Sequence, residues 1–74
     1  MEFRVRIEDL RLPPNVAAGM NALLLMHLAY MLRATNEDPP PILVDREYRI
    51  TDGRHRAVAA LIAGRPDVLA VLDV

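Results

Sequence analysis

The residues with the clearest chemical potential form one short segment, Asp52-Gly53-Arg54-His55-Arg56. An apolar stretch precedes it and apolar residues at helical spacing follow, so we expect a strand, a glycine turn and the start of a helix. Free backbone N–H groups and the positive end of the dipole favour an anion at a helix N-terminus. Three basic side chains are unfavourable there unless an anion is present, and such local conflicts are typical of functional sites. The segment therefore predicts an anion-binding turn.

An ordinary capped helix is the alternative interpretation, and from spacing alone we weigh the two equally. Asp52 has the side chain of an N-cap residue, and the arginines could pair with Asp45, Glu47 or Asp67. Glu47 and Asp52 are also the carboxylates near the turn. They are the weak candidates for a general base, because turn carboxylates are more often capping or solvated.

Composition narrows the classes of function. We expect the 74 residues to form one domain, 1–74. Cysteine is absent, which excludes disulfides and thiolate metal sites, and the two histidines lie too far apart in sequence to indicate a metal site. The net charge of −1 does not favour direct DNA binding. With no targeting signal and no apolar run long enough to span a membrane, we expect a cytoplasmic protein.

The positioning elements follow from periodicity and turn residues. Period-two alternation predicts an opening strand, and Asn15 is the predicted cap of a long helix that ends near Ala34. From Arg54 a second helix follows, with apolar Ala57, Val58, Leu61 and Ile62 and a C-cap at Gly64. The predicted order is strand, long helix, strand, strand, helix, strand, with the strands at residues 3–7, 42–44, from 48 and 68–72.

The long predicted helix is apolar almost all the way round between Ala22 and Leu32. A surface helix of so small a protein should keep a polar face. Either the sheet and other helices enclose this one, or a second copy covers it. We favour a homo-oligomer through residues 22–32, because a 74-residue chain cannot easily wrap a helix on every side. His27 is accordingly interpreted as a packed or interface residue.

The segment from Ile50 to Ala60, followed by Gly64, resembles the core of the ParB/sulfiredoxin-like superfamily. That family carries a G-x-x-R-x-x-A turn and helix, and Gly53, Arg56 and Ala59 match its three positions. The preceding Pro41-Ile42-Leu43-Val44 resembles the family's Pro-Ile-x-Val strand. The resemblance implies a small α+β domain with a mixed sheet.

The same resemblance implies a phosphate site at the turn, since the family binds CTP in ParB partition proteins and ATP in sulfiredoxin. Gly53 would allow close backbone approach, Arg56 would contact phosphate, and His55 matches a histidine of the sulfiredoxin signature. With Arg54, these are the expected phosphate-binding residues, and no metal is expected. The cofactor class implied is a nucleotide such as CTP or ATP.

Departures from the family narrow the expected function. Sulfiredoxin's catalytic cysteine falls at Arg54, so that chemistry is excluded, and ParB proteins usually have an acidic residue there. The sequence also stops after the closing strand, so we expect no DNA-reading helix-turn-helix. We expect a stand-alone regulatory or accessory module of the kind that phages and mobile elements encode. The alternatives are an interaction protein acting through helix 22–32 with a vestigial turn, or a nuclease or phosphotransferase.

Overall fold

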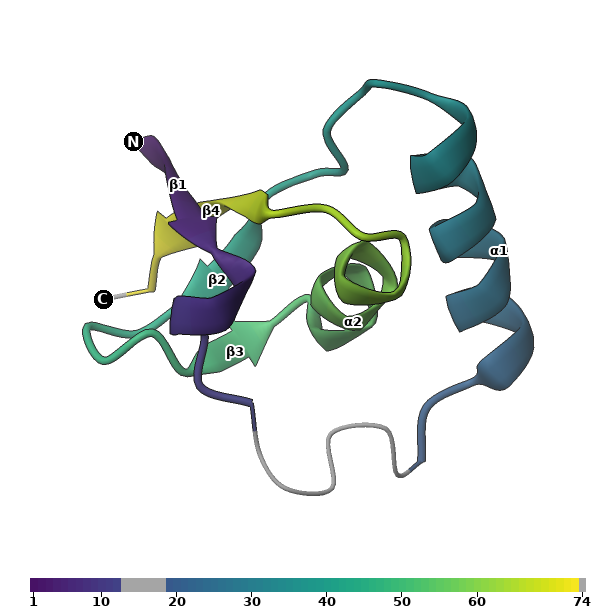
Figure 1. Cartoon of the computed structure of the whole chain (residues 1–74). Helices are drawn as coiled ribbons and strands as arrows, with labels where there is room; N and C mark the ends of the chain where they lie inside the picture. Colours follow the sequence, from purple (N-terminus) through teal and green to yellow (C-terminus); the bar gives the residue numbers. More distant parts are fainter. Residues whose placement is uncertain (13–18, 74) are drawn as a thin grey trace.

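The computed structural model describes residues 1–12 and 19–73, and its elements follow the predicted order (Figure 1). A short 3-10 turn, η1, after the first strand is the one addition. The fold is α+β, as predicted. The elements are β1 (Glu2–Arg6), η1 (Ile7–Asp9), α1 (Ala22–Ala34), β2 (Ile42–Val44), β3 (Ile50–Asp52), α2 (Arg54–Ile62) and β4 (Asp67–Leu72).

The four strands form one mixed sheet in the order β1-β4-β2-β3. The apolar closing strand β4 occupies an inner position, antiparallel to β1 and parallel to β2. Strands β2 and β3 pair antiparallel as a hairpin, but β3 begins at Ile50 rather than at the predicted Tyr48. The reason is the turn: the Asp45 carboxylate accepts the backbone N–H groups of Glu47 and Arg49, and Tyr48 takes a left-handed conformation with φ of 64°. Pairing therefore starts later than the apolar pattern indicates.

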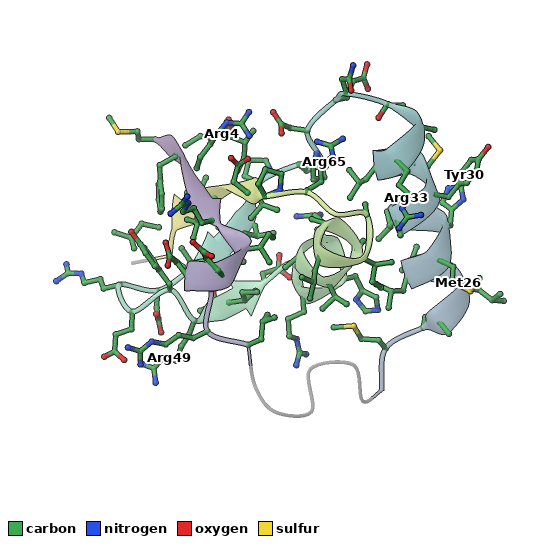
Figure 2. All side chains as sticks on the ribbon, in the orientation of Figure 1. Arg4, Met26, Tyr30, Arg33, Arg49 and Arg65 are labelled. Atoms are coloured by element: carbon green, nitrogen blue, oxygen red, sulfur yellow. The ribbon has the colours of Figure 1, made fainter. Side chains whose placement is uncertain are left out.

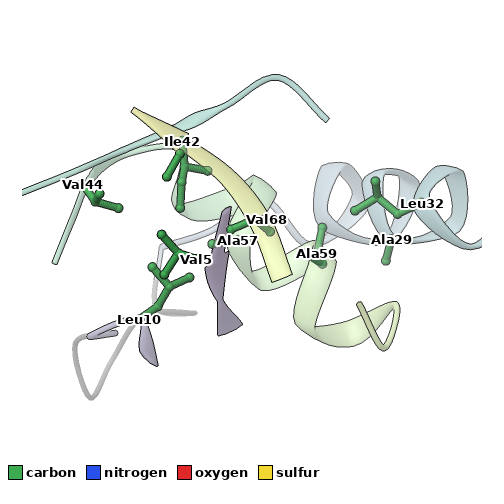
Figure 3. Close-up of a cluster of buried hydrophobic side chains, with 11 residues drawn as sticks. Val5, Leu10, Ala29, Leu32, Ile42, Val44, Ala57, Ala59 and Val68 are labelled. Carbon is green, nitrogen blue, oxygen red and sulfur yellow. The ribbon is translucent and has the colours of Figure 1, made fainter. Parts of the chain in front are cut away.

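Helix α2 lies between the sheet and α1, so the molecule has three layers (Figure 1). Consecutive α2 residues from Ala57 to Ala60 are all buried, as expected for a helix covered on two sides. Leu61 and Ile62, which continue the apolar spacing of the sequence, are about half exposed, and the small alanine side chains of α2 let the sheet and α1 approach closely. Figure 3 shows the resulting core. Its members are Val5, Leu10, Ala29, Leu32, Ile42, Val44, Ala57, Ala59, Ala60, Val68 and Ala70.

Helix α1 begins at Ala22, not after Asn15. The Asn21 side chain caps it by accepting the backbone N–H of Leu24 at 3.1 Å, and Gly19 with φ of 76° precedes the cap. Asn15 lies outside the described residues. One side of α1 packs on α2 and the opposite side is exposed, so the less favoured alternative, in which the sheet and other helices enclose it, is wrong. In the described ranges no helix is long and apolar enough to cross a membrane.

Helix α2 ends at Ile62 with Ala63 as its C-cap, one residue before the predicted cap residue Gly64, which has φ of 78°. The backbone N–H of Gly64 donates to Leu61 and that of Arg65 to Ala60, which is the paired pattern of a Schellman C-cap. The cap turns the chain back toward the sheet, where β4 begins at Asp67. It thereby fixes where α2 stops, and with it the length of the helix that carries the candidate site at its start.

Candidate functional site

The candidate site lies where β3 passes into α2. Gly53, with φ of 94°, is the N-cap residue, and the first helical hydrogen bond runs from the backbone N–H of Ala57 to its carbonyl. The backbone N–H groups of residues 54–56 therefore have no partner within the helix. Asp52 does not cap the helix, contrary to the capped-helix interpretation, because it still belongs to β3 and its side chain accepts no cap hydrogen bond.

A cavity of about 340 Å³ opens at this turn. It brings together all the predicted phosphate-binding residues, and it adds side chains of the outer helix α1 that sequence reasoning missed. Its lining consists of Leu24, Leu28, Thr51, Asp52, Gly53, Arg54, His55 and Arg56. The polar half of the wall comes from the turn, and Leu24 and Leu28 supply an apolar side.

The charges of the cavity are largely uncompensated. Arg54 and Arg56 form no ion pair with any described residue, whereas Asp45 and Glu47 pair with Arg49, and Asp67 pairs with Arg4. The pairing proposed by the capped-helix interpretation is therefore not made by the arginines of the turn. Two guanidinium groups and a helix N-terminus face a single lining carboxylate. This balance favours an anion.

Arg56 is anchored within the fold. Its Nη1 donates to the carbonyl oxygen of Pro41 at 3.0 Å, in a partly buried position. The guanidinium has further N–H donors beyond this bond, so it can hold the loop before β2 and contact a ligand at the same time. Arg54 is exposed, and its side chain makes no hydrogen bond to a described residue.

His55 connects the two helix N-termini. The backbone N–H of Asn21, the cap of α1, donates to Nε2 of His55 at 3.3 Å. With Nε2 acting as the acceptor, the neutral imidazole carries its proton on Nδ1 and can donate it to a ligand. The ring therefore positions the start of α1 beside the turn of α2.

The two catalytic candidates are separated. Glu47 lies in the β2–β3 turn, 3.9 Å from Arg11 and 3.6 Å from Arg49, and does not line the cavity. Asp52 does line it. Within the described residues no group of three His, Cys, Asp or Glu side chains is placed to hold a metal ion.

A second cavity of about 260 Å³ adjoins the first. Leu28 and Arg56 line both cavities. Its walls are mainly apolar and come from α1 and the segment before β2. The other lining residues are Met31, Leu32, Thr35, Glu37, Asp38, Pro39 and Pro40.

Shifted pKa values occur away from the turn. Hydrogen bonds from Arg4 hold the pKa of Asp38 below its ordinary value, and backbone and side-chain donors of Arg49 do the same for the pKa of Asp45. The side-chain hydrogen bonds to Asp38 and Asp67 raise the pKa of Arg4, and the side-chain hydrogen bond to Asp45 raises the pKa of Arg49. These groups stabilise the frame that carries the site.

Solved structures of two protein classes share this fold, although no family model and no curated protein matches the chain. The C-terminally truncated chromosome-partitioning protein ParB from Caulobacter crescentus, complexed with CTP-gamma-S, is 26% identical with a TM-score of 0.82, over 99% of this chain and 44% of that one. Sulfiredoxin from Arabidopsis thaliana is 20% identical with a TM-score of 0.81, over 99% and 84%. A Pnob8-like ParB-N domain is 24% identical with a TM-score of 0.74, over 97% and 29%.

The chain therefore has a ParB/sulfiredoxin-like fold, as its sequence resemblance predicted. It spans less than half of the Caulobacter ParB chain that it matches. The aligned part includes the Gly53–Arg56 turn, because the match covers 99% of this chain.

Proposed function

We propose that the chain is a ParB-like module that binds a phosphate-bearing ligand, of nucleotide class, in the cavity at the Gly53–Arg56 turn. One observation carries the proposal: Arg54 and Arg56, free of ion pairs with described residues, share a cavity with the unpaired N–H groups of α2. Phosphate oxygens match both kinds of donor. The Caulobacter ParB of the same fold was crystallised with CTP-gamma-S, which supports the same ligand class.

The adjoining apolar cavity favours a nucleotide over a bare phosphate. Small-molecule sites are mostly apolar clefts with a few convergent polar groups. Here the polar groups lie in one cavity and the apolar walls in the next, with Leu28 and Arg56 between them. A ring in the apolar cavity and phosphates at the turn would use both. CTP and ATP are the nucleotides to test first.

Calorimetric titration tests the proposal. We expect saturable binding of CTP or ATP that weakens with salt, and a loss of about tenfold or more in affinity for Arg54→Gln, since a charge-assisted hydrogen bond contributes about 1.5–3 kcal/mol. Arg46→Gln, in the exposed β2–β3 turn, is the matched control for loss of one positive charge. Absence of binding by nucleotides and tripolyphosphate at millimolar concentration would overturn the proposal, as would equal losses in the two variants.

No reaction is part of this proposal. A nuclease or phosphotransferase would depend on Asp52 alone, because Glu47 lies outside the cavity. Turnover of a bound nucleotide that requires a divalent metal and disappears in Asp52→Asn would add an enzymatic role.

A second role, contact with another protein through α1, is favoured by a specific observation. Leu23, Met26 and Tyr30 are largely exposed on a helix that carries no acidic residue. Surface patches of this kind mark interaction sites. We propose that α1 is such a surface, as expected from the homo-oligomer prediction. Pull-down or sedimentation experiments with charged substitutions at Leu23, Met26 or Tyr30, which do not line the phosphate cavity, address this role.

A further inference from the structure

The outer face of α1 is a single apolar stripe. Leu23, His27, Tyr30 and Ala34 recur at spacings of four, three and four residues, the repeat that lines up side chains along a helix–helix seam. All four are exposed, and Met26 flanks the stripe. Figure 2 shows the side chains of Met26 and Tyr30 pointing away from α2. The inward side is a different set of residues that includes the buried Ala29 and Leu32.

We propose that a second copy of this chain covers the stripe, with the two α1 helices packed antiparallel about a two-fold axis between His27 and Tyr30. This inference deepens the protein-contact role proposed for α1 and is independent of the phosphate site. The axis pairs Leu23 of each copy with Ala34 of the other, a large side chain against a small one. His27 meets Tyr30 at the centre.

The exposed apolar area suits a dimer. Among the large apolar side chains of this face the exposed fractions are 80% for Leu23, 68% for Met26 and 68% for Tyr30. At about 200 Å² for a fully exposed large side chain, these sum to roughly 430 Å². That lies within the range of the largest patch on an ordinary monomer, about 300–600 Å², and supplies about half of the ~800 Å² that each partner contributes to a stable interface.

Charge favours a second copy in this orientation. The single formally charged side chain of α1 is Arg33, near its C-terminal end, where its Nη2 donates to the carbonyl of Ile62. Antiparallel packing keeps the two Arg33 side chains apart and opposes the two helix dipoles. Parallel packing would place Arg33 beside Arg33 and Tyr30 against Tyr30. A neutral, self-complementary stripe needs no oppositely charged partner.

Sedimentation equilibrium at tens of micromolar tests the interface. We expect wild-type dimers, and a dimer affinity about 100-fold or more weaker in Tyr30→Glu. Because Tyr30 is exposed, the monomeric variant should stay folded, which circular dichroism checks. Leu61→Glu is the matched control, since Leu61 is an exposed apolar residue of α2 outside the stripe, and it should dimerise like wild type. A wild-type monomer at 100 µM would overturn the proposal, and so would undisturbed dimers in Tyr30→Glu.

Cysteine cross-linking tests the orientation, because the natural chain has no cysteine. At 1.5 Å rise per residue, residue 27 lies about 5 Å along the axis from its copy, and residue 23 about 17 Å. We expect a disulfide in His27→Cys alone, none in Leu23→Cys or Ala34→Cys alone, and a mixed disulfide when the last two are combined. Self-cross-linking of Leu23→Cys would instead show parallel packing. The two proposals fail separately. A wild-type monomer that still binds nucleotide would overturn only the dimer, and a dimer that binds no nucleotide would overturn only the phosphate site.

Discussion

Gly53 lies directly against Ile42. A Cβ atom added at Gly53 would come within 2.8 Å of Cγ2 and 3.1 Å of Cβ of Ile42, a residue of β2 that is fully buried. Gly53 also has φ of 94°, in the region that side chains rarely adopt. The glycine of the turn is therefore required by the packing of the chain as well as by access for an anion. The same residue sets the position of α2 on the sheet and exposes its N–H groups.

Gly53→Ala should destabilise the protein by about 2–5 kcal/mol, from the sum of a backbone cost of about 1–2 kcal/mol and overpacking against Ile42 of about 1–3 kcal/mol. Gly64→Ala is the matched control. The φ of Gly64 is 78°, but nothing lies within 4 Å of the added Cβ. Gly64→Ala should therefore lose only the stability that corresponds to the backbone cost. Urea unfolding measures both. Equal losses of stability in the two variants would show that Ile42 moves aside without destabilising the protein.

Arg65 should be a stability determinant, because it holds the end of a helix to which it does not belong. Its Nη2 donates to the carbonyl oxygens of Leu32, Thr35 and Glu37 at 2.9–3.0 Å, around the C-terminus of α1. We expect Arg65→Met to cost about 2–3 kcal/mol, since hydrogen bonds from charged donors are lost at a partly buried helix end. Arg33→Met, which loses one bond to the Ile62 carbonyl, should cost less. The reverse order in thermal unfolding would contradict this reasoning.

Protonation of Asp38 in acid should lower the stability of the protein. Arg4 hydrogen bonds hold the folded-state pKa of Asp38 below the ordinary 3.8 of the unfolded chain. The stabilisation is therefore fully present above the unfolded pKa, and it is lost as pH falls through the lower, folded-state pKa. Asp38→Asn should be less stable than wild type at pH 7 and should show a shallower loss of stability below about pH 5. Urea midpoints measured from pH 7 to pH 2 check this, and parallel curves for the two proteins would refute it.

Much of the frame could be predicted because its determinants are local. Alternation in β1, the Gly64 cap and the apolar closing strand each specify an element without distant contacts. The start of α1 could not be chosen by composition, since Asn15 and Asn21 are both N-cap residues by type and the structure shows Asn21 as the cap. The start of β3 depended on the Asp45 side chain and on a left-handed Tyr48, which apolar periodicity does not encode.

The candidate site divides in the same way. Residues 53–56 are contiguous, so sequence alone brings them together. Leu24 and Leu28 enter the cavity from α1 through tertiary packing. Their apolar character is explained equally well by core, interface or ligand contact, and no local signal separates these roles. The prediction that Asp52 caps the helix is wrong because Gly53, which has no side chain, is the N-cap residue.

Substitutions of the two arginines of the turn should have different effects on stability and on nucleotide binding. Arg54 is exposed at the positive end of α2, so Arg54→Gln should leave stability unchanged or raise it by about 0.3–1 kcal/mol while it weakens nucleotide binding. Arg56→Gln loses the bond to the Pro41 carbonyl as well, and should cost about 1–3 kcal/mol in addition to the loss of affinity. Urea unfolding without ligand and calorimetric titration, performed on both variants, give the four values needed. A residue retained at the expense of stability is expected where function requires it. If Arg54→Gln destabilised the free protein as much as Arg56→Gln, Arg54 would be structural, and the anion site would be left with Arg56 alone.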